Sequence, residues 1–215
     1  MPVDASVSSG PRPPLTIAAA LGMLEDAGAR SALLVEGWSD EAALEALARR
    51  RGWRLPAEGV VIVPIGGVTN LGKFVQALGP AGLDLRLAGL YDAGEAQHVQ
   101  RALRQQLAPD AALTPATVEA LGFFACDADL EDELIRALGS AAVERVLAAE
   151  GELESFRRFQ SQPDQRGRDS RAQLRRFMGT RAGRKIRYGS LLVEALAPGQ
   201  VPRALECVLA HARSA

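Results

Sequence analysis

Residues 60–63 form an uninterrupted run of β-branched side chains, Val-Val-Ile-Val, between Gly59 and Pro64. Such a run is typical of a parallel strand buried on both faces, because a strand with one wet face would alternate apolar and polar residues. Similar apolar runs occur at 31–35, 85–91 and 123–126, and segments with helical spacing separate them. Alternating strands and helices predict an α/β fold whose mainly parallel sheet has four strands joined by right-handed crossovers.

The helical pattern divides the chain of 215 residues into three parts. Residues 1–13 are rich in proline, glycine and serine, which predicts a disordered leader. Residues 14–139 should form the α/β core with an N-terminal helix, and residues 140–215 a helical, arginine-rich C-terminal subdomain. Helices are expected at 16–27, 39–52, 70–78, 95–107, 115–121, 130–138, 141–150, 190–196 and 204–211.

Composition excludes several classes of protein. The net charge of −1 predicts no global attraction of anions, so a nucleic-acid site must be a local patch. Two cysteines and two histidines, far apart in the sequence, do not suit a zinc site or a disulfide framework. No apolar run approaches about 18 residues, so no membrane span is predicted. The first residues lack the features of a signal peptide, and we expect a cytoplasmic protein.

Acidic residues follow three of the four predicted strands. Glu36 ends the first strand, Asp92 the third, and Asp127 and Asp129 follow the fourth. Ligands of open parallel sheets bind at the carboxyl ends of the strands, so these acids should meet at one edge. Oxygen ligands without histidine or cysteine favour Mg²⁺ or Mn²⁺. Carboxylate clusters suit phosphoryl chemistry with two metal ions roughly 4 Å apart.

Helix capping is the alternative explanation for part of this pattern. Acidic side chains stabilise helix N-termini, and Asp40, Asp129 and Glu131 each stand where a helix is expected to begin. For any one of these residues the two explanations stay open. Capping alone accounts less well for acids at three strand ends together.

Residues 67–73 read Gly-x-x-x-x-Gly-Lys, like a phosphate-binding loop. Phe74 stands where such a loop carries the serine or threonine that holds magnesium, so an NTPase is a minor alternative. A glycine turn at Gly66-Gly67, followed by a helix that Thr69 or Asn70 caps, explains the same residues. Lys73 would then lie near the acidic edge of the sheet.

Residues 156–188 carry eleven basic side chains against two acidic ones. Positive charge of this density is what binding to a phosphate backbone requires, although a solvated helix face would give the same composition. The chain contains only two lysines, Lys73 and Lys185, among many arginines. A lysine retained in such a chain indicates a position that needs a compact ammonium rather than a planar guanidinium.

As a set, these motifs resemble the TOPRIM domain, the Rossmann-like metal-dependent fold of topoisomerases, bacterial primases, certain small RNases and OLD-family nucleases. The resemblance covers about residues 30–195 and rests on Val35-Glu36-Gly37-x-x-Asp40, on Val63-Pro64-Ile65-Gly66-Gly67 and on the strand that ends at Asp92. The form is most similar to the OLD nucleases, through the segment 69–74, the acidic block 129–134 and a late lysine.

The resemblance implies a role for each matching residue. Glu36, Asp92 and Lys185 would be catalytic, with Glu36 as general acid/base and Lys185 stabilising charge on the scissile phosphate. Glu36 and Asp92 would also bind metal, together with Glu131 and Asp129, and Asp40 would either bind metal or support a residue that does. The density of basic charge, rather than the resemblance, predicts that nucleic acid is bound by Lys73, Arg175, Arg176, Arg181, Arg184 and Arg187. The glycines Gly37, Gly66 and Gly67 are expected to form turns.

The chain departs from the TOPRIM pattern at Gly94, which replaces the second acid of an Asp-x-Asp pair. Glu95 would have to substitute as the ligand, so either two ions or one are expected. The ATPase half of OLD proteins is not found in this sequence. We predict a metal-dependent phosphodiesterase acting on DNA or RNA, with DNA favoured. The alternative is a catalytically degenerate module that binds nucleic acid or a separate ATPase, and a homodimer stays open.

Overall fold

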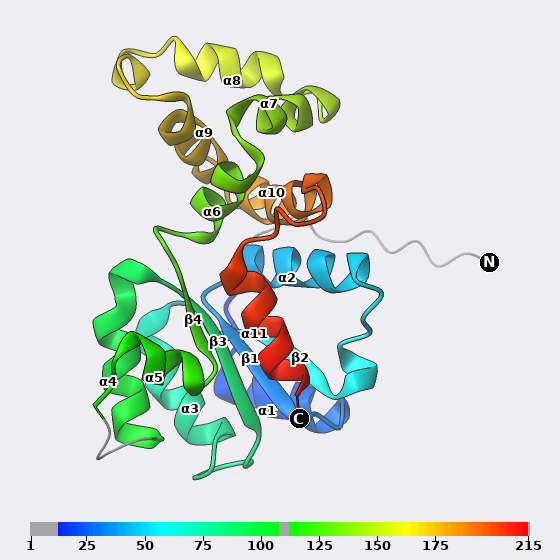
Figure 1. Cartoon of the computed structure of the whole chain (residues 1–215), viewed down its shortest axis with the longest axis vertical. Coiled ribbons are helices and arrows are strands. Elements are labelled where there is room, and N and C mark those ends of the chain that lie inside the picture. Colours follow the sequence, from blue (N-terminus) through cyan, green and yellow to red (C-terminus); the bar gives the residue numbers. More distant parts are fainter. Residues whose placement is uncertain (1–12, 108–111, 215) are drawn as a thin grey trace, which may run out of the picture.

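The computed structural model in Figure 1 describes residues 13–107 and 112–214. Apart from Pro13, the predicted leader lies outside the described residues. The centre of the molecule is a sheet of four parallel strands in the order β2-β1-β3-β4, which confirms the predicted fold class. The strands are β1 (Ser31–Val35), β2 (Val60–Pro64), β3 (Arg86–Asp92) and β4 (Phe123–Cys126).

Helices connect and flank these strands, and those expected before residue 139 are present with small differences at their ends. The α-helices are α1 (Ile17–Asp26), α2 (Trp38–Arg50), α3 (Leu71–Leu78), α4 (Ala96–Gln106), α5 (Pro115–Ala120), α6 (Leu130–Leu138), α7 (Ser140–Ala149), α8 (Leu153–Gln160), α9 (Ser170–Gly179), α10 (Ala182–Ala195) and α11 (Arg203–Arg213). Short 3₁₀ turns are η1 (Pro56–Glu58), η2 (Val68–Asn70), η3 (Ala93–Glu95) and η4 (Pro163–Gln165). None of the helices in the described ranges is long and apolar enough to cross a membrane.

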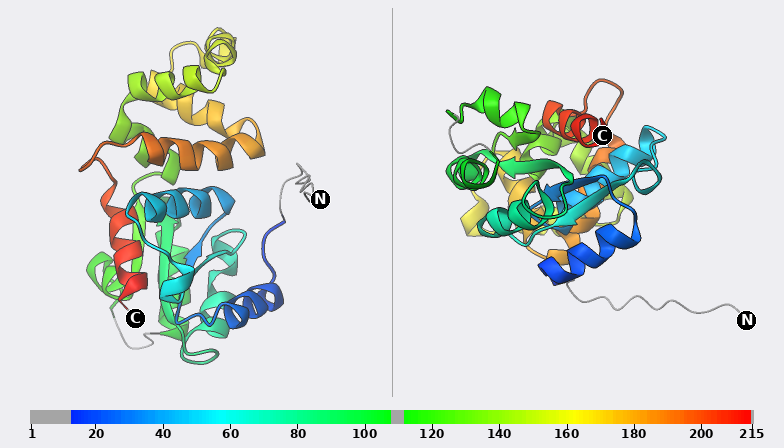
Figure 2. Two further views of the ribbon diagram at one scale, coloured as in Figure 1. Left: turned by 90° about the vertical axis from the view of Figure 1, so that its right-hand side faces the viewer. Right: turned by 90° about the horizontal axis from the view of Figure 1, so that it is seen from below.

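Both faces of the sheet are covered, which explains the uninterrupted apolar strands. Leu33 and Val35 of β1 pack in one apolar cluster with α2, α10 and α11. Ala32 and Leu34 point to the other face and pack with α1, α3 and α4. Figure 2 shows these helices on the two sides of the sheet. Because successive side chains of a strand point to opposite faces, the residues from Ala32 to Val35 alternate between the two apolar clusters.

The chain after β4 forms a helical lobe beyond the carboxyl edge of the sheet. In Figure 1 this lobe contains α7, α8 and α9, whereas α10 lies along α2 and α11 returns to pack against β3 and β4. Phe156 and Phe177 join α8 and α9 edge to face, with ring centroids 5.2 Å apart. They belong to the same apolar cluster as Leu33. The boundary between residues 139 and 140 therefore stays a prediction, because the lobe and the α/β core share this cluster.

Helix α10 begins at Ala182, earlier than the helix expected at 190–196. Its buried side chains include Tyr188, Leu192 and Val193, and the arginines before them conceal this apolar face in the sequence. Gly189 allows α10 to lie against α2, since a Cβ there would come within 2.6 Å of the Ser39 carbonyl oxygen. This close approach holds the middle of α10 against the first turn of α2.

Candidate functional site

The end of β1 leads into α2 through a tight turn that brings two carboxylates to the edge of the sheet. Glu36 follows the strand and is exposed. Gly37 is the N-cap of α2 in an extended conformation, and its N–H donates a hydrogen bond of 2.8 Å to Oδ2 of Asp40. Asp40 therefore caps the helix, as the alternative explanation predicted, and it also faces the neighbouring acids.

The Gly66-Gly67 turn supports the position of Glu36. Both glycines have positive φ values, 72° and 110°, a region that favours glycine. Their N–H groups donate to the backbone carbonyl of Glu36 at 3.0 and 3.3 Å. Asn70, one of the two predicted caps, occupies the N-cap position of α3, but its side chain makes no capping hydrogen bond and its amide instead donates to the carbonyl of Ile65 at 3.0 Å. The turn is thus held from both sides.

Asp92 lies at the end of β3, beside the end of β1. Its pKa is raised to about 7, mainly by burial and also by the charges of Glu36, Asp129, Asp40 and Glu95. Glu95 lies on the 3₁₀ turn after the strand, and burial together with Glu36 raises its pKa as well. The strand ends therefore bring these acids into one electrostatic environment.

Two residues of the acidic block complete this group from α6. Asp129 caps α6, its Oδ1 accepting from the Asp132 N–H at 2.8 Å, while its Oδ2 accepts from Arg175 Nε at 2.6 Å. Glu131 is buried, and its Oε2 lies 3.2 Å from Lys185 Nζ. Its Oε1 is also buried but has no hydrogen-bond partner among the described residues. A buried carboxylate oxygen without a partner is costly and suits a ligand such as a cation.

The pKa of Asp40 is raised, like that of Asp92. Its pKa is raised to about 7, mainly by burial; the charges of Glu131 and Glu36 also raise it, whereas the Gly37 N–H and Lys185 lower it. Burial also raises the pKa of Glu131. For Lys185, burial opposes the charge, but Glu131 and Asp40 outweigh it and the pKa is raised. The acids thus carry more negative charge than their nearby cations compensate.

The thermal stability of the metal-free protein is expected to fall as pH rises from 5 to 8. The folded-state pKa values of Asp40 and Asp92, about 7, exceed the ordinary value of 3.8. Between these values the folded state binds more protons than the unfolded state, so stability decreases with increasing pH. Asp40→Asn should flatten the dependence of Tm on pH, whereas Asp164→Asn, on the exposed turn η4, should not. A Tm that rises over this range in the wild type would contradict the assignment.

The donor set fits a hard divalent cation by its chemistry, because it consists of carboxylate oxygens and includes the partnerless Glu131 Oε1. The acidic side chains do not converge closely enough to coordinate an ion. Across residues 13–107 and 112–214, no three Asp, Glu, His or Cys side chains form a group that could hold a metal ion. Arg175 and Lys185 neutralise Asp129 and Glu131 instead. Metal binding would have to compete with these ion pairs.

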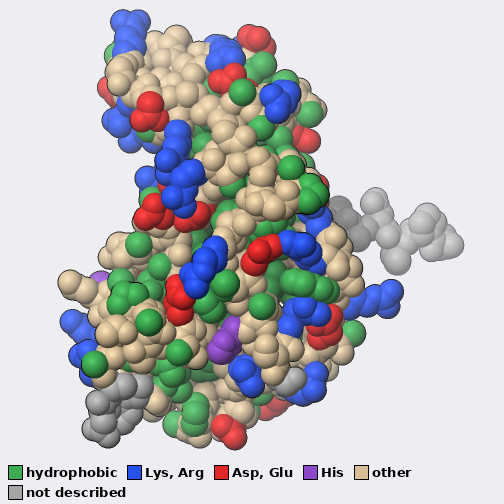
Figure 3. Space-filling model, in the orientation of Figure 1, with side chains coloured by type: hydrophobic (Ala, Val, Ile, Leu, Met, Phe, Trp, Pro, Cys, Tyr) green, Lys and Arg blue, Asp and Glu red, His purple; other side chains and the backbone are tan. Residues whose placement is uncertain are grey.

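Two adjoining hollows meet at Lys185. The basic groove has a volume of about 580 Å³ and is lined by Asp129, Glu131, Arg168, Ala172, Arg175, Arg176, Gly179 and Lys185. The acidic cleft, of about 330 Å³, is lined by Glu36, Gly37, Trp38, Ser39, Asp40, Gly66, Gly67, Gly179, Lys185 and Ile186. Figure 3 shows basic and acidic side chains side by side between the helical lobe and the α/β core.

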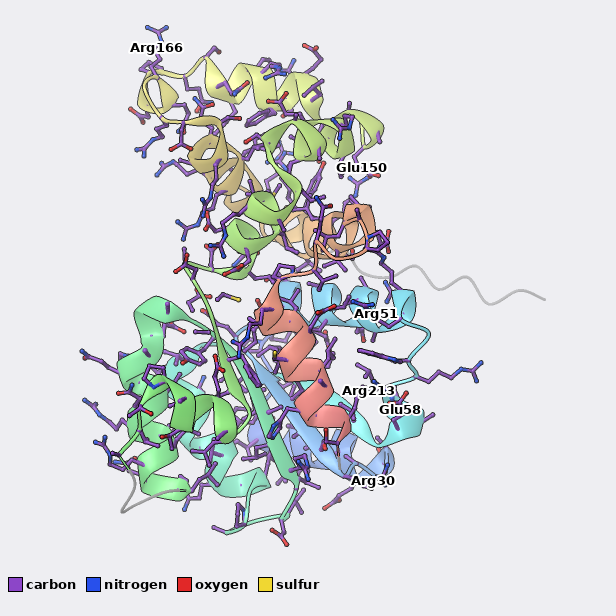
Figure 4. All side chains as sticks on the ribbon, in the orientation of Figure 1. Arg30, Arg51, Glu58, Glu150, Arg166 and Arg213 are labelled. Atoms are coloured by element: carbon purple, nitrogen blue, oxygen red, sulfur yellow. The ribbon has the colours of Figure 1, made fainter. Side chains whose placement is uncertain are left out.

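The predicted basic residues do not gather at one place. Arg175 and Arg176 line the basic groove with Arg168. Arg184 is buried instead, 3.9 Å above the Phe177 ring and hydrogen-bonded to Glu152. Arg187 forms an ion pair with Glu150. Lys73 and Arg181 are exposed but line neither hollow. Figure 4 shows Arg166 at the outer end of the lobe.

Sequence reasoning missed the contribution of Arg168 and of Gly189. Arg168 stands among exposed arginines, and only the folded arrangement distinguishes it from them. Gly189 gives no signal in the sequence beyond a glycine within a helix, where glycine is unfavourable and can indicate close packing. Its contact with α2 places Lys185 beside Glu131 and Asp40.

This fold, with acids at the ends of β1 and β3 and a Gly-Gly turn after β2, is the arrangement of a TOPRIM domain. Residues 29–93 match the family model described as "Overcoming lysogenization defect protein-like, TOPRIM domain". The chain therefore carries an OLD-like TOPRIM domain, which confirms the resemblance. The matched residues include Glu36, Asp40 and Asp92 but end before Gly94, Glu131 and Lys185.

Solved structures extend the likeness in fold to most of the chain. The C-terminal region of the Xanthomonas campestris pv. campestris OLD protein is 24% identical, with a TM-score of 0.69, covering 88% of this chain and 95% of that chain. The C-terminal region of the Burkholderia pseudomallei OLD protein is 20% identical, with a TM-score of 0.68, covering 86% and 98%. No curated protein sequence gives a significant match.

Proposed function

We propose that this protein is a metal-dependent phosphodiesterase that cleaves nucleic acid, with DNA the favoured substrate. The observation that carries the proposal is the meeting of acids from β1, β3 and α6 beside Lys185, in one electrostatic environment. Such an acidic site next to a basic groove suits the cleavage of a polyanion, because the arginines hold the backbone while a cation offsets the acids.

Each residue of the site would have a distinct task. Glu36, Asp40, Asp92 and Glu131 would hold Mg²⁺ or Mn²⁺, with Glu95 and Asp129 at the margin, and the bound ion would polarise a phosphoryl oxygen. Glu36, which is exposed, would accept the proton of an attacking water. The ammonium of Lys185 would donate to an oxygen of the scissile phosphate, and Arg168 and Arg176 would hold neighbouring phosphates.

The direct test is incubation with plasmid DNA, single-stranded DNA and structured RNA, with Mg²⁺, with Mn²⁺ and with a chelator. We expect cleavage that requires the metal and that works on DNA. Absence of cleavage under every metal condition would refute the proposal. A loop-based NTPase has little support, since Phe74, at the position of the expected hydroxyl, is buried in the core.

A binding module without catalysis is the second candidate, favoured by the ion pairs that already occupy Asp129 and Glu131. Under both proposals, Arg168→Ala combined with Arg176→Ala should weaken DNA binding and lower the slope of log affinity against log salt by about 2. Arg104→Ala, on α4, should change neither quantity. Fluorescence anisotropy at several salt concentrations measures both. Equal effects of the groove pair and Arg104→Ala would place the DNA elsewhere.

Gly94→Asp is expected to increase metal affinity, on the order of tenfold, by adding a carboxylate beside Asp92. The site accepts a side chain, because a Cβ at Gly94 meets nothing within 4 Å, and Gly94 is not among the glycines with positive φ. Calorimetric titration with Mn²⁺ measures the change. Gly94→Asn has nearly the same shape without the charge and should bind metal like the wild type. Equal affinities for all three proteins would show that residue 94 does not face the ions.

A further inference from the structure

A third hollow adjoins the acidic cleft on the side away from the basic groove. This apolar pocket has a volume of about 200 Å³ and is lined by Pro14, Glu36, Gly37, Trp38, Pro64 and Gly66. It shares Glu36 and Trp38 with the acidic cleft, just as the cleft shares Lys185 with the basic groove. The three hollows therefore follow one another along the carboxyl edge of the sheet.

The walls of the apolar pocket suit a flat, uncharged group. Two proline rings and the Trp38 indole supply rigid apolar surface, and Glu36 is the one charged residue among the described residues that line it. A volume of about 200 Å³ is below the range of roughly 300–1,000 Å³ typical of pockets that enclose a whole drug-sized ligand. The pocket therefore fits one ring system rather than a nucleotide with its phosphates.

Trp38 lies at the edge of the sheet, where it lines both the acidic cleft and the apolar pocket. Within the described residues, Trp38 belongs to neither of the two apolar clusters that stabilise the sheet. Trp53, the other tryptophan, packs against the larger cluster, and its ring centroid lies 3.8 Å from the guanidinium carbon of Arg213. Trp38 is half-buried at the first position of α2, next to Glu36.

We propose that the apolar pocket binds the base of an unpaired nucleotide beside the scissile phosphate, so that the substrate is single-stranded at the point of cleavage. This inference rests on the proposed function. The order of the hollows matches the parts of one strand: phosphates in the basic groove, the scissile phosphate in the acidic cleft and a base against Trp38. Aromatic side chains bind unpaired bases by stacking, whereas a base within a duplex must first leave its stack.

The test uses the fluorescence of Trp38 and needs no cleavage. In Trp53→Phe protein with chelator present, an unstructured oligodeoxynucleotide should quench the remaining tryptophan. A duplex of the same sequence should bind without quenching it. Trp38→Ala should weaken binding of the single strand about tenfold, and Trp38→Phe should recover most of the affinity. If Trp53→Phe does not fold, the single strand can be added to the wild type and to Trp38→Phe instead. Quenching that occurs in the wild type but not in Trp38→Phe would then come from Trp38.

Several results would overturn the inference. Equal quenching by duplex and single strand, or a Trp38→Ala protein that binds the single strand like the wild type, would show that no base enters the pocket. These outcomes are distinct from failure of the proposed function, which is absence of metal-dependent cleavage in the wild-type protein. A protein that cleaves duplex DNA with no quenching of Trp38 would keep the function and refute the pocket.

Discussion

Glu36→Gln is expected to abolish metal-dependent cleavage while the protein remains folded and binds DNA. Glu36 is exposed at the end of β1, so the amide should cost little stability. Its charge, however, acts on Asp40, Asp92 and Glu95, which places it at the centre of the acids that would hold a cation. Loss of a group that only supports a metal ligand lowers metal affinity or activity roughly 10–100-fold. We therefore expect loss of a ligand to lower the cleavage rate about a hundredfold or more.

The measurement is the single-turnover rate on DNA with saturating Mn²⁺, accompanied by anisotropy and a melting curve. Asp92→Asn should give a similar loss of rate. Glu45→Gln is the matched control, because Glu45 lies on the exposed surface of α2 in a loose pair with Arg49, 3.9 Å away. Cleavage that persists in Glu36→Gln at the wild-type rate would assign the activity to another site or to a contaminant.

The sheet and its acidic edge could be predicted because local pattern determines them. An apolar run such as 60–63 indicates a strand covered on both faces, and the acid after a parallel strand must lie at the carboxyl edge. Glu36 and Asp92 follow strands that are neighbours in the sheet, so their proximity follows from topology alone. The spacing of Gly37 and Asp40 likewise determines the capping contact between them.

The helical lobe could not be predicted at the same level because its contacts depend on tertiary packing. Nothing in the pattern of the arginines separates Arg184, which is buried and bonded to Glu152, from Arg176, which lines the basic groove. The ion pair of Arg175 with Asp129 joins residues 46 positions apart. The roles of the individual arginines therefore depend on how α9 and α10 pack against α6.

Lys185→Met should reduce the rate of cleavage by roughly a hundredfold or more, the usual effect of losing a donor that stabilises charge in the transition state. Affinity for DNA should change much less, because the arginines of the basic groove remain. Lys185→Arg should recover little of the rate. The Lys185 ammonium fits 3.2 Å from Glu131 Oε2 at the junction of two hollows, and a planar guanidinium distributes its donors differently.

Lys185→Met leaves Glu131 buried without its partner. A lower cleavage rate alone would therefore not show whether the substitution removed a catalytic group or destabilised the protein. Adding Glu131→Gln to Lys185→Met removes the unpaired charge and should restore most of the Tm. The rate should stay low, because the donor to the phosphate is still missing and a metal ligand has been lost as well. The single variant Glu131→Gln separates the loss of the metal ligand from the loss of the donor. Excess Mn²⁺ should partly restore the cleavage rate of Glu131→Gln but should not restore that of Lys185→Met. If the double variant recovered the cleavage rate together with the Tm, Lys185 would be a structural residue. Its function would then be limited to the ion pair with Glu131.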